Sequence, residues 1–210
     1  MIKLKTHLSL MTQEERANAF THGIGFCMII VFSPFLLASE PYSLQFMGLC
    51  AFVFGMSLMF FCSTVYHMVI DERRKSIWRT IDHISIYILI SCSYTPFILF
   101  YYNEPAGIHF LTFHWAMACI GIVFKLFFRE RHELLSVIFY LILGWMVIFI
   151  FKTMTSNMNE QVKFWLFLGG VSYTLGIIFY MWDSLKWNHA IWHIFVNIGC
   201  AGHLIALLIS

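Results

Sequence analysis

Seven long apolar stretches, joined by short polar connections, constrain the fold of this chain more than any other feature. A helix that crosses a membrane needs about 20 predominantly apolar residues, because the hydrocarbon layer is about 30 Å thick. The qualifying stretches are Ala17–Ala38, Leu44–Ile70, Trp78–Tyr101, His109–Phe128, Leu134–Phe151, Val162–Met181 and Asn188–Ile209. Charged residues make up only 11% of the chain, against about 25% in a soluble domain. The sequence therefore predicts an all-α integral membrane protein, a seven-transmembrane-helix bundle.

The connections between these stretches are too short to separate two domains, and the sequence shows no internal repeat. We expect a short cytosolic N-terminal segment, residues 1–16, followed by a single transmembrane domain, residues 17–210. Within the first segment, Thr12 and Glu15 have the spacing of a capping box. This pair predicts a helix that starts before the first span and continues into it.

The lysines and arginines outside the spans predict the orientation, because cytoplasmic loops carry an excess of both residues. The N-terminal segment and the second, fourth and sixth connections, with their flanking residues, lie on one side. That side holds Lys3, Lys5, Arg16, Arg73, Arg74, Lys75, Arg79, Lys125, Arg129, Arg131 and Lys186. The opposite side holds only Lys152 and Lys163. The N-terminus is therefore predicted to be cytoplasmic and the C-terminus to be outside.

Charge and cysteine usage exclude other classes of function. The net charge of +2 is small, so the chain lacks the basic character of a nucleic-acid-binding protein. All six cysteines lie inside apolar stretches and none forms a C-x-x-C pair. Cysteine ligands for a metal are therefore not expected, and histidine is the better candidate.

Two histidines four residues apart, His189 and His193, open the seventh span. On a helix they lie on one face, one turn apart, so both imidazoles can reach one metal ion. In the predicted orientation, His67 lies near the cytoplasmic end of the second span and Asp82 in the first turns of the third. An ionised aspartate inside the bilayer costs about 2.5–3.5 kcal/mol even on insertion scales, so it needs a partner. All four side chains are expected at one level, in the cytoplasmic half of the membrane.

Three histidines with an open fourth position are typical of a catalytic zinc site. We expect His67, His189 and His193 to bind Zn²⁺, which activates a bound water in such sites. Asp82 is placed to hydrogen-bond that water or to orient a ligand. Ser63, one turn before His67, is placed to contact the water or a substrate carbonyl. The alternative is that all of these are interfacial residues that snorkel or bond to neighbouring backbone.

The remaining histidines are weaker candidates. His22 lies in the cytoplasmic half of the first span and is a candidate to support a ligand or to face a substrate. His83 points about 100° around the helix from the preceding aspartate, so we expect it to make a separate contact. His203 lies about 15 Å along the helix from His193, too far to share its metal. His114 is interpreted as an ordinary residue of the surface or interface.

These residues and their order resemble a known family. The matching motifs are Glu15-x-x-Asn18-x-x-Thr21-His22-x-x-Gly25, Ser63-x-x-x-His67, Asp82-His83 and His189-x-x-x-His193. The chain resembles the bacterial hemolysin III proteins of the progestin and adipoQ receptor family over nearly its whole length. The resemblance implies a seven-helix bundle with the N-terminus inside.

By the same resemblance, relatives similar to adiponectin receptors bind zinc through three histidines, with an aspartate holding a water. Carried over to this sequence, these residues are His67, His189 and His193, with Asp82 on the water and Ser63 nearby. Relatives are linked to hydrolysis of lipid amides such as ceramide. The bacterial branch is associated with haemolysis and with membrane homeostasis.

Three functions remain open at this point. The first is a zinc-dependent hydrolase of a lipid amide or ester. The second is a membrane-homeostasis regulator, or a receptor-like protein, with structural zinc. The third is a pore-forming cytolysin, which is the weakest because a secreted pore former needs a soluble form. We expect a membrane lipid as substrate or ligand, no nucleic acid, and a location in the bacterial inner (cytoplasmic) membrane as a multi-pass protein.

Overall fold

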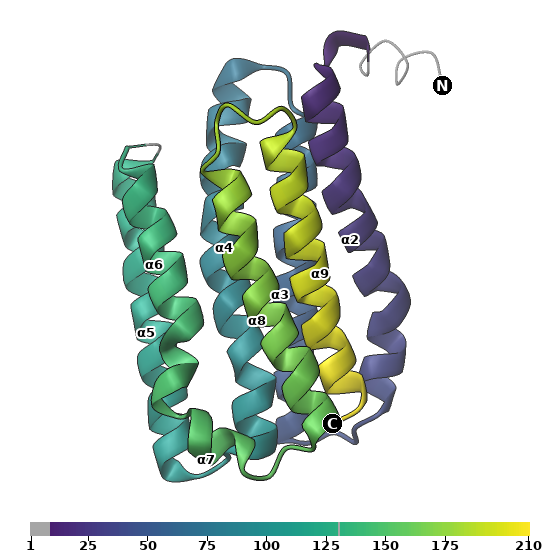
Figure 1. Cartoon of the computed structure of the whole chain (residues 1–210), viewed down its shortest axis with the longest axis vertical. Coiled ribbons are helices and arrows are strands. Elements are labelled where there is room, and N and C mark those ends of the chain that lie inside the picture. Colours follow the sequence, from purple (N-terminus) through teal and green to yellow (C-terminus); the bar gives the residue numbers. More distant parts are fainter. Residues whose placement is uncertain (1–8, 130) are drawn as a thin grey trace.

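The computed structural model describes residues 9–129 and 131–210 as a bundle of parallel and antiparallel helices (Figure 1). The elements are α2 (Gln13–Ala38), α3 (Leu44–Met68), α4 (Glu72–Tyr101), α5 (Pro105–Phe128), α6 (Glu133–Trp145), η1 (Met146–Phe149), α7 (Phe151–Thr155), α8 (Glu160–Tyr180) and α9 (Asn188–Leu208). Helices α2, α3, α4, α8 and α9 form the main body, and α5 and α6 lie as a pair on one side of it (Figure 1). The described residues contain no strand, so the all-α prediction is confirmed.

Four of the described helices, α2, α3, α4 and α8, begin where a polar side chain caps a free backbone N–H group. Thr12 caps α2, because its Oγ1 accepts a hydrogen bond from the Glu15 N–H at 3.1 Å. Ser43, Asp71 and Asn159 cap α3, α4 and α8 in the same way. Such caps each contribute about 1 kcal/mol. The predicted helix start near Thr12 is confirmed, and α2 begins at Gln13, four residues before the predicted span.

Six of the described helices are long and apolar enough to cross a membrane: α2, α3, α4, α5, α8 and α9. The fifth predicted stretch, Leu134–Phe151, does not form one continuous α-helix. Helix α6 has 13 residues, and the chain then continues as the four-residue 3₁₀ helix η1. The sequence pattern predicted the apolar length here but not the change of helix type.

The change of helix type arises from Tyr94 on α4. Its hydroxyl donates a hydrogen bond to the Gly144 carbonyl at 2.7 Å and accepts one from the Val147 N–H at 2.7 Å. In a continuous α-helix the Val147 N–H would donate to the Leu143 carbonyl four residues back. A side chain inserted into the backbone ladder is a known cause of helix interruption. It also keeps the freed backbone groups hydrogen-bonded, as an apolar environment requires.

His114 supports the same interruption, and its interpretation as a surface or interface residue is wrong. The ring is fully buried, its Nε2 donates to the Leu143 carbonyl at 3.1 Å, and its Nδ1 lies 3.1 Å from Ser91 Oγ. The reason is that α5 begins at Pro105. His114 is therefore more than two turns inside the helix, where α5 packs against its neighbours.

We expect Tyr94→Phe to lower the free energy of unfolding by about 1–3 kcal/mol, because it leaves the Gly144 carbonyl and the Val147 N–H without their partner in an apolar stretch of the chain. Thermal unfolding in detergent measures this loss. Tyr101→Phe is the matched control, since Tyr101 is on the same helix and its hydroxyl makes no hydrogen bond with the described residues. Equal midpoints for the two variants would contradict the account of the interruption.

Helix α2 approaches α3 and α9 closely at Gly25. A side chain at this position would collide with the ring of Phe60 on α3 and with the Asn197 amide oxygen on α9. The close approach lets the Asn197 Nδ2 donate to the Thr21 carbonyl at 3.1 Å. It therefore fixes the first half of α2 against α3 and α9, about two to three turns from the helix ends where the histidines lie.

Candidate metal centre

Three histidines from two helices meet at one end of the bundle. His67 lies in the last turn of α3, and His189 and His193 lie in the first turns of α9. One ring nitrogen from each lies within 4.8 Å of the other two, so the group can hold a metal ion. The ring centroids are 5.0 Å apart for His67 and each of the other two, and 4.6 Å apart for His189 and His193. Their predicted convergence is confirmed.

Hydrogen bonds to α2 orient two of these rings. His193 Nδ1 lies 3.1 Å from the Asn18 carbonyl oxygen and 3.1 Å from Thr21 Oγ1. Because a carbonyl can only accept, Nδ1 of His193 carries the proton and the lone pair of the neutral ring is on Nε2. Thr21 Oγ1 itself donates to the Asn18 carbonyl at 2.9 Å.

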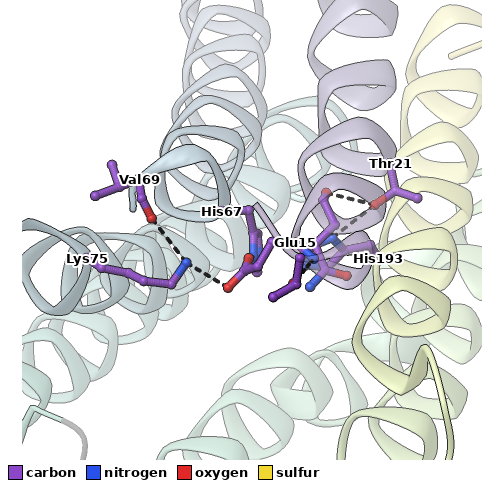
Figure 2. A network of polar contacts seen from close by, with 8 residues as sticks. Glu15, Thr21, His67, Val69, Lys75 and His193 are labelled. Atoms are coloured by element: carbon purple, nitrogen blue, oxygen red, sulfur yellow. Dashed lines mark hydrogen bonds and ion pairs between the residues drawn. The ribbon is translucent and has the colours of Figure 1, made fainter. Parts of the chain in front are cut away.

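The second oriented ring is His67, whose Nδ1 lies 2.6 Å from Glu15 Oε2. The other carboxylate oxygen, Oε1, lies 2.6 Å from Lys75 Nζ. Lys75 in turn donates to the Val69 carbonyl at 3.2 Å. Figure 2 shows Glu15 between His67 and Lys75, with Thr21 on the same helix as Glu15, α2, and His193 on α9. This arrangement also directs Nε2 of His67 away from its carboxylate partner.

Two ring nitrogens of the histidine group have no hydrogen-bond partner among the described residues and are suited to bind a metal. Nε2 of His67 and Nε2 of His189 are both buried and have no hydrogen-bond partner among the described residues. A buried polar atom without a partner is costly and calls for an explanation. A metal ion accounts for both atoms at once, because each neutral imidazole offers a lone pair to it. The donor set therefore fits a metal held by histidine.

Asp82 and Ser63 line the same cavity as His189 and His193 but stand outside the three-histidine group. Asp82 is 6% exposed on α4, and Ser63 is 1% exposed on α3. The Ser63 hydroxyl lies beside the Asp82 carboxylate without a hydrogen bond of standard geometry. Arg79 and Lys125 interact electrostatically with the same carboxylate. Asp82 thus faces the cavity that His189 and His193 also line and is not a member of the three-histidine group.

His22 is the closest of the other histidines. Its ring stacks on that of His193 with centroids 3.5 Å apart, and both of its nitrogens are buried without a partner among the described residues. It also faces the cavity described below. His203 lies elsewhere on α9, packed edge-on against Phe97 and Tyr173. The expectation that His203 stands apart from the metal group is confirmed.

A cavity of about 400 Å³ leads away from the histidines through the bundle. Its polar end is formed by Ser63, Asp82 and His189. Its walls are mostly apolar side chains of α4, α6 and α8 and include Ile148 and Phe167. Ile148 lies on η1 and Phe167 on α8, and both side chains are more than half exposed, so the cavity is lined there by residues that also reach the outer surface. The shape suits a molecule with a polar group at one end and a long apolar part.

Sequence reasoning missed the residues that support the histidines. Glu15 was interpreted as part of a helix cap and as one residue of a family motif, without a partner, and Lys75 only as a positive charge of a cytoplasmic connection. A signal was present, since Glu15, Asn18 and His22 recur at the spacing of one helix face. Polar residues on one face of an otherwise apolar helix indicate a buried partner.

The fold and the site together define a multi-pass α-helical membrane protein with a buried three-histidine group that can hold a metal ion. The profile of haemolysin-III-related proteins matches residues 10–204. The chain belongs to the haemolysin-III-related family, and the predicted resemblance is confirmed.

Individual relatives extend from bacteria to mammals. The hemolysin-3 homolog of Bacillus subtilis (strain 168) is 38% identical over 199 residues, which cover 93% of each chain. Hemolysin-3 of Bacillus cereus is 36% identical over 204 residues, 96% of this chain and 93% of that protein. The human monocyte to macrophage differentiation factor is 31% identical over 206 residues, 92% of this chain and 83% of that protein.

Proposed function

We propose that this protein is a zinc-dependent hydrolase of an amide or ester of a membrane lipid. The observation that carries the proposal is the grouping of three histidine nitrogens within 4.8 Å at the polar end of an apolar cavity. Three protein ligands leave a coordination position for water or substrate, which distinguishes catalytic from structural zinc sites. The arrangement therefore favours the hydrolase over a regulator with structural zinc.

His67, His189 and His193 would hold the metal. Zinc is the best choice because imidazole nitrogens suit it, and it takes tetrahedral sites with three histidines. When bound, it would polarise a carbonyl and activate a water. In the group that the structure describes, all three members are histidines, so the softer thiolate-preferring metals are less well matched.

Asp82 and Ser63 would handle the proton and the carbonyl. The Asp82 carboxylate would accept a proton from the attacking water and return it to the departing nitrogen or oxygen, which is general acid–base catalysis. The Ser63 hydroxyl would donate a hydrogen bond to the carbonyl oxygen of the substrate. Both side chains line the polar end of the cavity, so a scissile bond there would lie next to both groups.

The lipid acyl chain would occupy the apolar length of the cavity. Tyr180 and Arg79 both bond to Glu133 near the end where the histidines lie, so polar pairs close that end between α4, α6 and α8. The exposed side chains of Ile148 on η1 and Phe167 on α8 line the cavity and would form an apolar opening to the lipid. A chain entering sideways from the lipid would pass through this opening and bring its polar end to Asp82.

We further propose seven crossings of the inner membrane, with the N-terminus in the cytoplasm and the C-terminus outside. The start of α2 and the C-terminus lie at opposite ends of the bundle (Figure 1). Helix α6 runs beside α5 (Figure 1), and the apolar segment Glu133–Phe149, which is shorter than the six long helices, would supply the remaining crossing. The eleven-to-two bias of Lys and Arg puts the histidine end on the cytoplasmic side.

The test is release of fatty acid from a panel of acyl amides and acyl esters by the purified protein in lipid nanodiscs. We expect release that stops when a chelator removes the metal and returns when Zn²⁺ is added back, because the water is activated only at the metal. Release that is insensitive to the chelator, or no release across the panel, would contradict the proposed hydrolysis.

A further inference from the structure

We propose that Glu15 is a positioning residue for the metal centre: it fixes the tautomer and orientation of His67, and Lys75 holds Glu15 in place for this task. The inference rests on the proposed metal site and extends it to a residue of α2 that contacts neither metal nor substrate. Figure 2 shows the chain of contacts from Lys75 through Glu15 to His67.

The geometry of Glu15 suits this role on both of its oxygens. Oε2 lies 2.6 Å from His67 Nδ1, and Oε1 lies 2.6 Å from Lys75 Nζ. His67 is only 3% exposed, whereas the Glu15 and Lys75 side chains are 24% and 20% exposed. Glu15 therefore links a buried imidazole to a cation near the surface. With both oxygens engaged, the carboxylate is a partner of the ligand rather than a ligand itself.

The hydrogen bond determines which nitrogen of His67 is available. A carboxylate accepts the Nδ1–H, so the lone pair of the neutral ring is on Nε2, the nitrogen that is buried without a partner. A carboxylate behind a ligating histidine also raises the basicity of the ligand, and losing such a partner typically costs about 10–100-fold in metal affinity. His67 is the member of the group that lies on α3, so its orientation decides whether α3 and α9 can share one ion.

Lys75 keeps this carboxylate in place. Its ammonium group is bonded to the Val69 carbonyl at 3.2 Å as well as to Glu15, so it is anchored to the connection between α3 and α4. The Lys75 charge also favours the ionised form of the carboxylate. A displaced or protonated Glu15 would accept the Nδ1–H less well and leave the His67 ring free to turn.

The experiment compares Zn²⁺ affinity in the purified full-length protein by competition with a chromophoric chelator. Glu15→Gln is expected to weaken binding at least about 10-fold, because a neutral amide replaces the carboxylate at nearly the same size. Glu14→Gln is the matched control, since it removes the same charge from the preceding, exposed position of α2 and is expected to leave affinity unchanged. Equal affinities for the Glu15 and Glu14 variants would overturn the proposal.

Visible spectra of the Co²⁺-loaded protein give a second measurement. If the Glu15 ion pair were purely structural, its loss would leave this spectrum unchanged. At saturating Co²⁺, Glu15→Gln is expected to change the position and intensity of the ligand-field bands, because the orientation and donor strength of His67 change. An unchanged spectrum in a folded Glu15→Gln protein would overturn the role in positioning.

Lys75→Gln keeps the proposal testable if the Glu15 variant fails to fold. It is expected to weaken Zn²⁺ binding relative to the wild-type protein, whereas Arg73→Gln, which changes an exposed cation nearby, is expected to have no effect. Equal affinity of the Lys75 and Arg73 variants would contradict the role of Lys75. A wild-type protein that binds no Zn²⁺ would instead reject the metal centre itself, so the two failures are distinguishable.

Discussion

His67→Ala, His189→Ala and His193→Ala are each expected to weaken Zn²⁺ binding at least about 10-fold, and the triple variant is expected to bind none at this site. Each substitution removes one of the three ring nitrogens that lie within 4.8 Å of one another. The measurement is zinc per chain after purification, together with affinity by competition. We expect about one zinc per wild-type chain, since the structure offers one such group among the described residues.

The matched control is His203→Ala. It removes a buried histidine from the same helix α9 but from a position about 15 Å from His193, so zinc content is expected to stay at the wild-type level. Undiminished zinc in the triple variant would reject the histidine group as the site. If His203→Ala lost as much zinc as the triple variant, the zinc loss in both would be explained by damaged folding instead.

Asp82→Asn is expected to lower turnover by about 10²–10⁴-fold, the range for losing a general acid–base group, while zinc stays bound. Asparagine has nearly the same size as aspartate but cannot take up the proton. Asp82 stands outside the three-histidine group, so its loss leaves the ligands in place. Initial rates of fatty-acid release and zinc content, measured on the same preparation, give both quantities.

Asp183→Asn serves as the control for this substitution, because Asp183 is exposed in the connection between α8 and α9 and is expected to leave the rate unchanged. Turnover by Asp82→Asn at the wild-type rate would remove Asp82 from the proposed mechanism. If Asp82→Asn lost zinc together with turnover, we would conclude that Asp82 stabilises metal binding and does not act by transferring a proton.

The positions of the helices follow from the sequence because apolar length decides where a chain can cross a membrane. The predicted span Asn188–Ile209 corresponds to α9, Asn188–Leu208, and Leu44–Ile70 corresponds to α3, Leu44–Met68. The interruption after Trp145 could not be predicted in this way. It depends on the hydroxyl of Tyr94, which is distant in sequence and reaches Gly144 only in the packed bundle.

The histidine group could be predicted because depth in the membrane is readable from span direction. His67 lies near the end of one span and His189 near the start of another, on the same side of the membrane. The span directions alone therefore predict that the two residues lie at the same depth. The partner of His67 was not predictable, because Glu15 is 52 residues away and meets it only through the rotation of α2 about its own axis. Rotation is set by contacts such as that at Gly25, which the apolar pattern does not encode.

X-ray absorption at the zinc K-edge of the purified wild-type protein tests the central claim most directly. The structure predicts three imidazole nitrogens at about 2.0–2.1 Å, with one further light atom completing a tetrahedral site. A sulfur neighbour at about 2.3 Å would contradict the histidine centre, as would a spectrum that fits fewer than three imidazoles. Four imidazole neighbours would contradict the open position on which hydrolysis depends.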